Sequence, residues 1–241
     1  MCGRLNVHAD PLARVFVLLT GQPFPGESSP NVAPTEQAWV ITPPGSGREA
    51  AEDVAAPHRT DAIARPMRWW LVPYWSSDPK PRYAMFNARS DSLRSSRAFR
   101  GAFERRRCLV PVTGFYEWIK EGTRRLPQHV TAADSGALLL AGIWEHWHSD
   151  TQAIDSFALV TTDVNPALAF LHDRQPAILD IANGLRWIDR ATGAHDAFAL
   201  LNSELPVDLA VTPVSEYVNN PRHKGEECTV ALGNPRFVAA S

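Results

Sequence analysis

The chain has 241 residues, of which 44% are hydrophobic and 21% are charged. This balance is typical of a folded protein with a buried core and excludes disordered and collagen-like chains. The net charge of −2 argues against indiscriminate binding to polyanions. The three cysteines, Cys2, Cys108 and Cys228, form no CxxC pair, so neither a disulfide framework nor a structural zinc site is expected.

No signal for export or membrane insertion is found in the sequence. An uncharged apolar run of about 18 residues, long enough to span a membrane, is absent. The first residues, MCGRLNVHAD, lack a basic region followed by an apolar run, so no signal peptide is predicted. We therefore expect a cytoplasmic protein with free thiols.

The first third of the chain is predicted to hold one helix, two strands and two loops. Asp10-Pro11 is typical of a helix start, with an N-cap followed by proline. Helical spacing then continues through Leu12, Val15, Phe16 and Leu19. Gly, Pro and Ser content predicts loops at residues 21–34 and 43–58, and apolar runs predict strands at 38–42 and 67–75.

Residues 92–107 are predicted as a helix whose arginines face the solvent. Its inward side would carry Leu93, Phe99, Ala102 and Phe103. Seven arginines and two acids between residues 87 and 107 give this segment a net charge of +5. Such a segment is either an ordinary solvated face or a surface that holds phosphates.

The second half of the chain is predicted to be mostly strands. Asn165-Pro166 and Asp180 are typical helix starts, and short helices are predicted at 180–189 and 194–204. Strands are predicted at residues 108–112, 114–119, 128–132, 137–147, 157–162 and 209–213. Because strands and helices do not alternate regularly, we predict a single α+β domain over residues 1–241. It would have a curved, mostly antiparallel β-sheet or barrel-like core flanked by short helices, and the last 15 to 20 residues or so would form a tail.

Cys2 becomes the N-terminal residue if Met1 is removed. The product would be an aminothiol, whose α-amine has a pKa of about 8 and is far more available at neutral pH than a lysine. That amine can attack an aldehyde to form a Schiff base, and the thiol can then close a thiazolidine ring. The alternative is an incidental cysteine, because reactivity depends on the surroundings.

Three further residues have side chains suited to chemistry. Asn87 lies in a run with Arg89, where an amide can orient a substrate and a guanidinium can clamp a phosphate, although Ser90 could simply cap a helix. Glu117 alternates with apolar residues on a predicted strand, so it is either solvent-facing or a buried proton carrier. His172 could be an acid or base near neutral pH, or a structural histidine.

Together these motifs, in this order, resemble the SOS response-associated peptidase (SRAP) family of abasic-site processing proteins. The resemblance covers about residues 2 to 222. It rests on Met1-Cys2-Gly3-Arg4, Asn31-Val32-Ala33-Pro34-Thr35, Met67-Arg68-Trp69 to Pro73, Asn87-Ala88-Arg89-Ser90, Cys108-Leu109-Val110-Pro111, Gly114-Phe115-Tyr116-Glu117-Trp118, Ala141-Gly142-Ile143-Trp144-Glu145, His172-Asp173-Arg174 and Asn219-Asn220.

The resemblance implies a catalytic role for four residues. Cys2 would crosslink to the abasic site, and Asn87 would hold the Cys2 terminus and the opened sugar. Glu117 would move protons during aldehyde attack and ring closure. His172 would protonate the sugar ring oxygen. The family name also implies a self-processing peptidase activity that exposes Cys2, within the SOS response to DNA damage, and a lyase reaction would be a minor branch.

The implied partner is single-stranded DNA that contains an abasic site. The protein would act as a monomer without a cofactor, and no metal is expected because the histidines are scattered. Stacking of Trp69 and Trp70 on bases would tolerate any sequence. The DNA contacts implied by the resemblance are Gly3, Arg4, Trp69, Trp70, Arg89 and Thr161.

The chain departs from the family pattern at three places. Asp91 stands where glutamate is more frequent, Trp70 replaces a glycine, and Gln175 follows His-Asp-Arg in place of methionine or arginine. These changes affect the DNA surface more than the reaction.

Three alternatives stay open from the sequence. An N-terminal cysteine hydrolase would use Cys2 against an amide and would not need Arg89. A non-catalytic single-strand binding module would bind without a covalent product, and its binding would survive the Cys2→Ala substitution. The third alternative is an unrelated structural domain with chance motifs.

Overall fold

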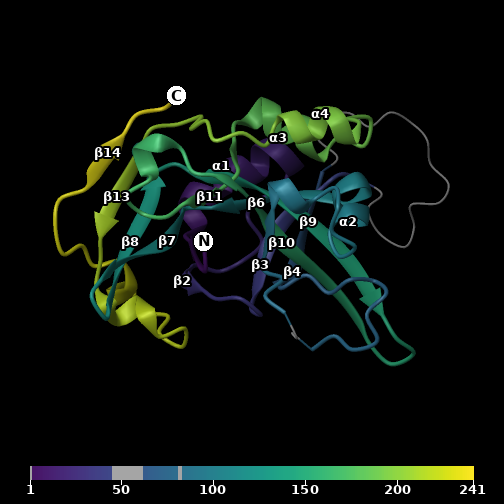
Figure 1. Cartoon of the computed structure of the whole chain (residues 1–241), viewed down its shortest axis with the longest axis horizontal. Coiled ribbons are helices and arrows are strands. Elements are labelled where there is room, and N and C mark those ends of the chain that lie inside the picture. The colour runs from purple at the N-terminus through teal and green to yellow at the C-terminus, as the bar shows by residue number, and fades with distance from the viewer. Residues whose placement is uncertain (1, 45–61, 81–82) are drawn as a thin grey trace.

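The computed structural model describes residues 2–44, 62–80 and 83–241 (Figure 1). The strands of this part of the chain form two sheets. The first has the order β14-β13-β8-β7-β1-β2. Its strands are β1 (Arg4–Val7), β2 (Ser29–Val32), β7 (Gly114–Glu121), β8 (Arg124–Ala132), β13 (Leu209–Pro213) and β14 (Arg236–Val238).

The second sheet contains a closed ring of five strands. Strand β10 pairs with both β4 and β9, and β3 and β6 complete the circle between them. This confirms the predicted α+β fold with a barrel-like core. The strands of this sheet are β3 (Gln37–Thr42), β4 (Ile63–Trp69), β5 (Asn87–Arg89), β6 (Arg107–Val112), β9 (Leu138–His148), β10 (Ala153–Asp163), β11 (Arg174–Pro176) and β12 (Ile178–Leu179).

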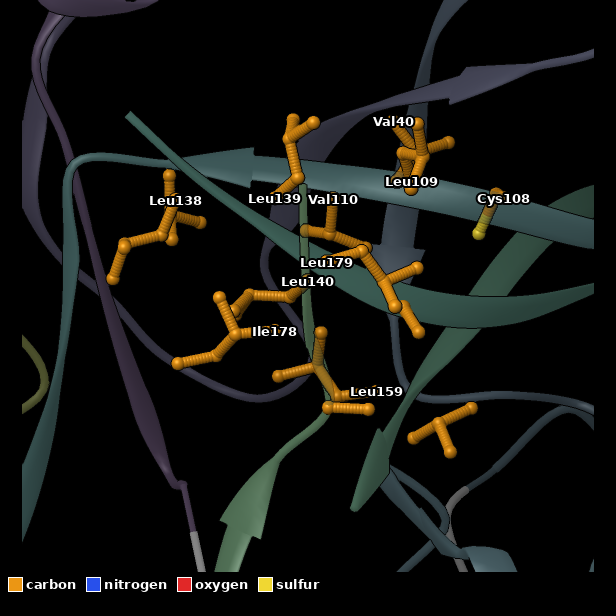
Figure 2. Packing of buried hydrophobic residues seen from close by; sticks show 14 of the residues in the cluster. Val40, Cys108, Leu109, Val110, Leu138, Leu139, Leu140, Leu159, Ile178 and Leu179 are labelled. Atoms are coloured by element: carbon orange, nitrogen blue, oxygen red, sulfur yellow. The ribbon is translucent and has the colours of Figure 1, made fainter. Parts of the chain in front are cut away.

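Most strand pairs are antiparallel, as predicted. The pairings of β10 with β4 and with β5 are parallel. Leucine, isoleucine and valine side chains of β6, β9 and β12 fill the space between these strands (Figure 2). Trp187 closes one end of this core, since its indole N–H donates to the carbonyls of Cys108 at 3.0 Å and Gly142 at 3.2 Å.

Four α-helices are found in the described residues: α1 (Ala9–Thr20), α2 (Arg100–Arg105), α3 (Ile181–Ile188) and α4 (Ala194–Ala199). Helix α1 buries Leu12, Phe16 and Leu19, as its spacing predicts. Asp180 caps α3 by accepting from the backbone N–H of Asn183 at 2.7 Å. No helix in this part of the chain is long and apolar enough to cross a membrane.

The predicted strands of the second half are confirmed, with shifts of a few residues at their ends. Other boundaries differ more. The loop predicted at 21–34 contains the short strand β2, the strand predicted at 67–75 runs from Ile63 to Trp69, and the last helix ends at Ala199. Most of the loop predicted at 43–58 lies outside the described residues.

The long helix predicted at residues 92–107 is wrong. The segment starts with the 3-10 turn η1 (Ser90–Ser92), and an α-helix forms only over Arg100–Arg105. Serine side chains bond to the local backbone here, with Ser92 Oγ donating to Arg89 O at 3.0 Å and Ser96 Oγ accepting from Ala98 N–H at 3.3 Å. Such bonds compete with helical hydrogen bonds, so the chain turns instead.

Further 3-10 turns are η2 (Pro166–Leu168), η3 (Glu216–Asn219) and η4 (Glu226–Thr229). The C-terminal stretch, predicted as a tail, includes β14, which pairs with β13. At the very end, the Ser241 N–H donates to Leu205 O at 3.0 Å. The last residues therefore lie against the sheet.

Candidate active site

Cys2 lies where the two sheets meet. It immediately precedes β1, which pairs with β7 of the first sheet. Its carbonyl oxygen accepts a 2.8 Å hydrogen bond from Nδ2 of Asn87, at the start of β5 in the second sheet. The Cys2 side chain is fully buried, and its thiol donates to Arg4 O at 3.6 Å. The backbone at Cys2 is thus fixed by both sheets.

The side-chain amide of Asn87 forms a hydrogen bond through its nitrogen but not through its oxygen. Its side chain is 8% exposed. Nδ2 donates to Cys2, whereas buried Oδ1 has no hydrogen-bond partner among the described residues. A buried amide oxygen without a partner costs free energy, so it is suited to receive a donor from a ligand.

Glu117 is buried on the core side of β7. It shares a face with Phe115, while Tyr116 and Trp118 pack on the opposite side. Only 4% of Glu117 is exposed, and burial raises the pKa of its carboxyl to about 7. Near neutral pH it can therefore both take and give a proton. The sequence left solvent exposure and burial open here, and the structure shows burial.

Burial and the charge of Glu117 both act on the Cys2 thiol. Burial is the larger cause and the nearby carboxylate the second, and together they hold the thiol pKa well above its usual range. Cys2 is therefore a protonated thiol in this state. The interaction also indicates that Cys2 and Glu117 share one site.

His172 lies in the loop before β11. Its Nδ1 accepts the backbone N–H of Arg174 at 3.1 Å and also contacts the Asp173 carboxylate. Partial burial is the main cause that lowers the His172 pKa, and Asp173 opposes it. The charge of Asp173 also acts on Glu117. The structure therefore brings the four predicted catalytic residues into one region.

Arg4 is held beside the site by the late Asn219-Asn220 motif. Its guanidinium lies 5.8 Å from the centre of the Trp118 ring and donates to Asn219 O at 3.4 Å. The Trp118 indole N–H donates to Asn219 Oδ1 at 2.6 Å. These contacts give Asn219 and Trp118 a positioning role that sequence reasoning did not assign.

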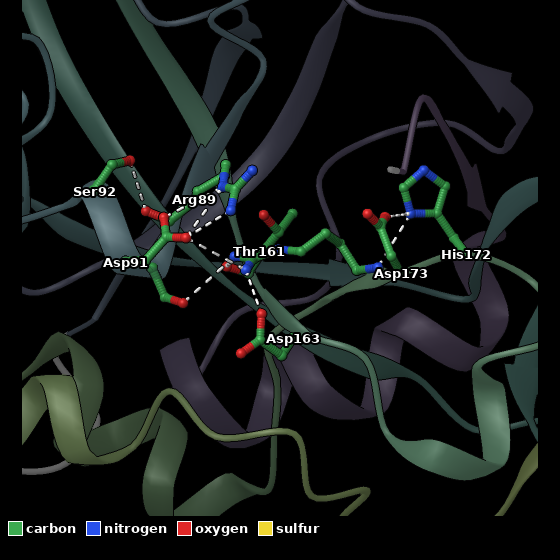
Figure 3. Close-up of polar contacts among 9 residues, drawn as sticks. Arg89, Asp91, Ser92, Thr161, Asp163, His172 and Asp173 are labelled. Carbon is green, nitrogen blue, oxygen red and sulfur yellow. Dashed lines mark hydrogen bonds and ion pairs between the residues drawn. The ribbon is translucent and has the colours of Figure 1, made fainter.

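Arg89 and Thr161 are neighbours in the parallel β5–β10 pair. Arg89 is exposed, and its guanidinium donates to both oxygens of the Asp91 carboxylate (Figure 3). Thr161 is fully buried, and its hydroxyl has no partner among the described residues. Of these two predicted DNA contacts, only Arg89 reaches the surface in this state.

The arginines of residues 87–107 do not form one solvated face. Arg107 points inward and is 4% exposed, and Arg106 pairs with the buried Glu145. Arg94 and Arg97 lie over aromatic rings, 4.1 Å from the centre of Phe198 and 4.4 Å from that of Trp75. Arg107 is therefore withdrawn from the predicted basic face and Arg106 is half-buried, whereas the other five arginines are exposed.

The assignment of Trp69 to base stacking needs correction. Trp69 is fully buried, and its indole N–H donates to Phe86 O at 2.8 Å, so neither ring face is open. Trp70 is half-buried and packs on Phe86, with ring centres 5.3 Å apart. The exposed aromatic side chains of this region include Tyr74, Trp75 and Tyr83, and the sequence analysis did not assign a role to Tyr74 or Trp75 although both lie within the apolar run.

Metal-ligating side chains form no candidate site in the described residues. No group of three or more His, Cys, Asp or Glu side chains there is arranged to hold a metal ion. The reactive groups of this region are a thiol, two proton carriers and an amide.

Known proteins with this pattern can now be compared. Abasic site processing protein YoqW of Bacillus subtilis is 28% identical over 234 residues, which cover 94% of this chain and 98% of YoqW. Abasic site processing protein HMCES of Rattus norvegicus is 32% identical over 203 residues, or 70% of this chain and 57% of HMCES. The match thus spans just over half of HMCES.

The fold recurs in solved structures. A protein of Bacteroides thetaiotaomicron superposes with a TM-score of 0.75 at 20% identity, covering 95% of this chain and 99% of that chain. A protein of Bordetella bronchiseptica gives a TM-score of 0.72 at 20% identity, covering 89% and 100%. The family model described as SOS response associated peptidase (SRAP) matches residues 1–221. The chain therefore belongs to the SRAP family.

Proposed function

We propose that this protein captures the ring-opened aldehyde of an abasic site in single-stranded DNA, covalently, on Cys2 after removal of Met1. Relatives named abasic site processing proteins support a DNA substrate of this kind. The observation that carries the proposal is the 2.8 Å bond from Asn87 to the Cys2 carbonyl, beside a carboxyl group with a pKa of about 7. It fixes the residue that would become the N-terminus next to a proton carrier.

The covalent chemistry needs only the groups of this site. The neutral α-amine of Cys2 adds to the aldehyde carbon, and the carbinolamine loses water to give an imine. The thiol sulfur then bonds to the imine carbon while its proton passes to nitrogen, which closes a thiazolidine. The sum is aldehyde plus aminothiol giving thiazolidine plus water. The ionised Glu117 carboxylate takes a proton from the amine nitrogen, gives it to the leaving hydroxyl, and then carries the thiol proton to the imine nitrogen.

His172 would help to open the sugar ring. The charged imidazolium of His172 carries a proton on Nε2 as well as on Nδ1. The Nε2 proton can be given to the ring oxygen of the abasic sugar as the aldehyde forms. Because burial lowers the pKa of His172, the imidazolium gives up this proton readily.

Two further activities belong to the same proposal. Hydrolysis of the Met1–Cys2 peptide bond by this site would expose the aminothiol. As a minor branch, an imine beside a proton-moving Glu117 can undergo β-elimination, which breaks the strand at the lesion. Both reactions use the proton carrier already described and require no cofactor.

The DNA contacts that we propose combine Gly3, Arg4 and Arg89 near the lesion with Trp70 and Trp75 for bases. An abasic position has no base to unstack, which favours a single strand. Arg4 and Arg89 supply the cations for phosphates. We further propose a monomer that acts in the cytoplasm as part of the SOS response.

The test is to mix the purified protein with a single-stranded oligonucleotide that bears one abasic site, followed by a denaturing gel and intact-mass measurement. We expect a heat-stable shifted band from protein that lacks Met1, and its loss with Cys2→Ala. No band despite confirmed loss of Met1 would refute the proposal. Salt-dependent binding alone would then favour a binding module, and turnover of a small amide would favour a cysteine hydrolase.

A further inference from the structure

Four charged side chains of alternating sign lie beside the proposed site: Arg89, Asp91, Arg174 and Asp163. Figure 3 labels three of them, Arg89, Asp91 and Asp163. Arg89 Nη2 is 2.7 Å from Asp91 Oδ2, and Arg174 Nη1 is 3.8 Å from the same oxygen. Arg174 in turn donates to Asp163 Oδ1 at 2.6 Å. One carboxylate oxygen of Asp91 therefore faces two guanidinium groups.

Asp91 occupies the edge of Arg89 that a phosphate would use. Arg89 Nε and Nη2 donate to the two Asp91 oxygens, at 3.2 and 2.7 Å. A phosphodiester presents two oxygens to a guanidinium in much the same way. The Asp91 carboxylate and a phosphodiester therefore cannot both accept from the same two N–H groups of Arg89 at once. In the DNA-free protein, Arg89 is thus already neutralised by an internal anion.

The contact between Arg89 and Asp91 can be exchanged. Both side chains are more than half exposed, at 57% and 53%, so neither is locked by packing. Arg174, by contrast, is 6% exposed and is fixed by Asp163 and by the Thr161 carbonyl at 2.6 Å. It offers Asp91 a stationary positive partner when Arg89 moves to a phosphate.

We propose that Asp91 is a specificity-determining residue. It pairs with Arg89, and a DNA phosphate can bind Arg89 only by replacing Asp91 as its partner. Intact single strands are then held weakly and released. A strand with an abasic site is retained by the covalent bond at Cys2, which does not depend on the strength of the Arg89 contact. This inference rests on the proposed function and adds a filter against undamaged DNA.

The test measures the affinity for an intact single-stranded oligonucleotide by fluorescence anisotropy over a series of salt concentrations. All proteins carry Cys2→Ala, so that no covalent step contributes. We expect Asp91→Asn to tighten binding about two- to fivefold, the scale of one exposed ion pair. The slope of log affinity against log salt should steepen by up to about 0.7, the value for one phosphate on a single strand.

The matched control is the same substitution in an Arg89→Ala background. If Asp91 acts through Arg89, the gain disappears there, whereas a general effect of net charge would persist and overturn the proposal. Weaker or unchanged binding by Asp91→Asn would also overturn it, because Asp91 would then orient Arg89 or do nothing. A missing covalent band from the wild-type protein on abasic DNA would refute the proposed function separately, since the intact-strand assay does not use Cys2.

Discussion

A carboxyl group buried next to a thiol decides the chemistry at the residue scale. Burial raises the pKa of Glu117 to about 7, and burial first and the charge of Glu117 second keep the Cys2 thiol protonated. A protonated thiol is a poor nucleophile. The order amine first, thiol second therefore follows from the electrostatics of the site, because the amine needs no help from a thiolate.

The pH dependence of crosslinking tests this assignment. We expect the single-turnover rate to rise through pH 7 as Glu117 ionises, and to rise further as the α-amine loses its proton near pH 8. The Glu117→Gln variant should be slower by about 100-fold and should lack the lower inflection. The rate would be measured by quenched samples on denaturing gels between pH 5.5 and about 9.

Glu121 supplies the control, since it lies on the same strand but is exposed. Glu121→Gln should keep the wild-type profile. If the inflection near pH 7 stays in Glu117→Gln, the titrating group is another residue, and the proton-carrier role of Glu117 is lost.

The sequence predicted which residues would matter but not how they meet. Cys2, Asn87, Glu117 and His172 were identified through a family resemblance. That Glu117 faces the core follows from the register of β7 against β1 and β8, which no local pattern reveals. Likewise, the burial of Trp69 follows from closure of the barrel, whereas its local sequence is equally compatible with an open face.

At the element scale, Arg107 joins two helices to the barrel. In the part of the chain that the structure describes, its guanidinium donates only to backbone carbonyls, at the C-terminal ends of α2 and α3 and just beyond. Helix C-termini leave such carbonyls without partners and favour a cation. The five acceptors are Phe103 (3.1 Å), Glu104 (3.4 Å), Trp187 (2.5 Å), Asp189 (2.9 Å) and Thr192 (2.7 Å).

Arg107→Met should therefore destabilise the protein strongly. We expect a loss of about 3–5 kcal/mol in the free energy of unfolding, because several buried carbonyls lose their donor together. Arg105→Met, two residues earlier on an exposed position, should change it by less than about 0.5 kcal/mol. Urea unfolding of the two variants checks this, and similar effects of both would contradict the role assigned to Arg107.

This arginine also shows why the helix prediction failed. Apolar spacing between Leu93 and Phe103 is compatible with a helix, and the arginines were counted as its outer face. The structure instead ends α2 at Arg105 and starts β6 at Arg107. Three of the five acceptors of Arg107 lie 80 or more positions away, so its inward direction depends on tertiary structure. The longer strands of the second half depended on local pattern and were predicted, whereas the short strands β1, β2, β5, β11, β12 and β14 were not.

At the scale of the whole molecule, two buried groups oppose each other in the pH dependence of stability. Glu117 binds its proton more tightly when folded, with a pKa of about 7 against 4.5. His129 binds its proton less tightly, with a pKa of about 4 against 6.5. Burial is the main cause in both cases. The His129 ring stacks on Tyr116, and its Nε2 is buried without a partner in the described residues.

Glu117 and His129 change the free energy of unfolding with pH in opposite directions within the same pH window. Between pH 4.5 and 6.5, Glu117 is protonated only in the folded state, so its contribution to stability is lost as pH rises through about 7. In that window His129 is protonated mainly in the unfolded state, so its contribution is lost as pH falls toward 4. Each slope has a magnitude of up to about 1.4 kcal/mol per pH unit, and their sum is close to zero.

Single substitutions should separate the two slopes. Glu117→Gln removes the group that favours acid, so its free energy of unfolding should fall faster than that of the wild type as pH drops from 6.5 to 4.5. His129→Phe keeps a ring on Tyr116 and removes the group that favours neutral pH, so it should gain stability relative to the wild type over the same range. Urea unfolding at pH 4.5, 5.5 and 6.5 would measure both differences, which should reach roughly 1 kcal/mol per pH unit in opposite directions. Parallel curves for the wild type and both variants would show that neither group has its proton affinity shifted by folding, and the buried carboxyl would then no longer explain proton transfer near neutral pH.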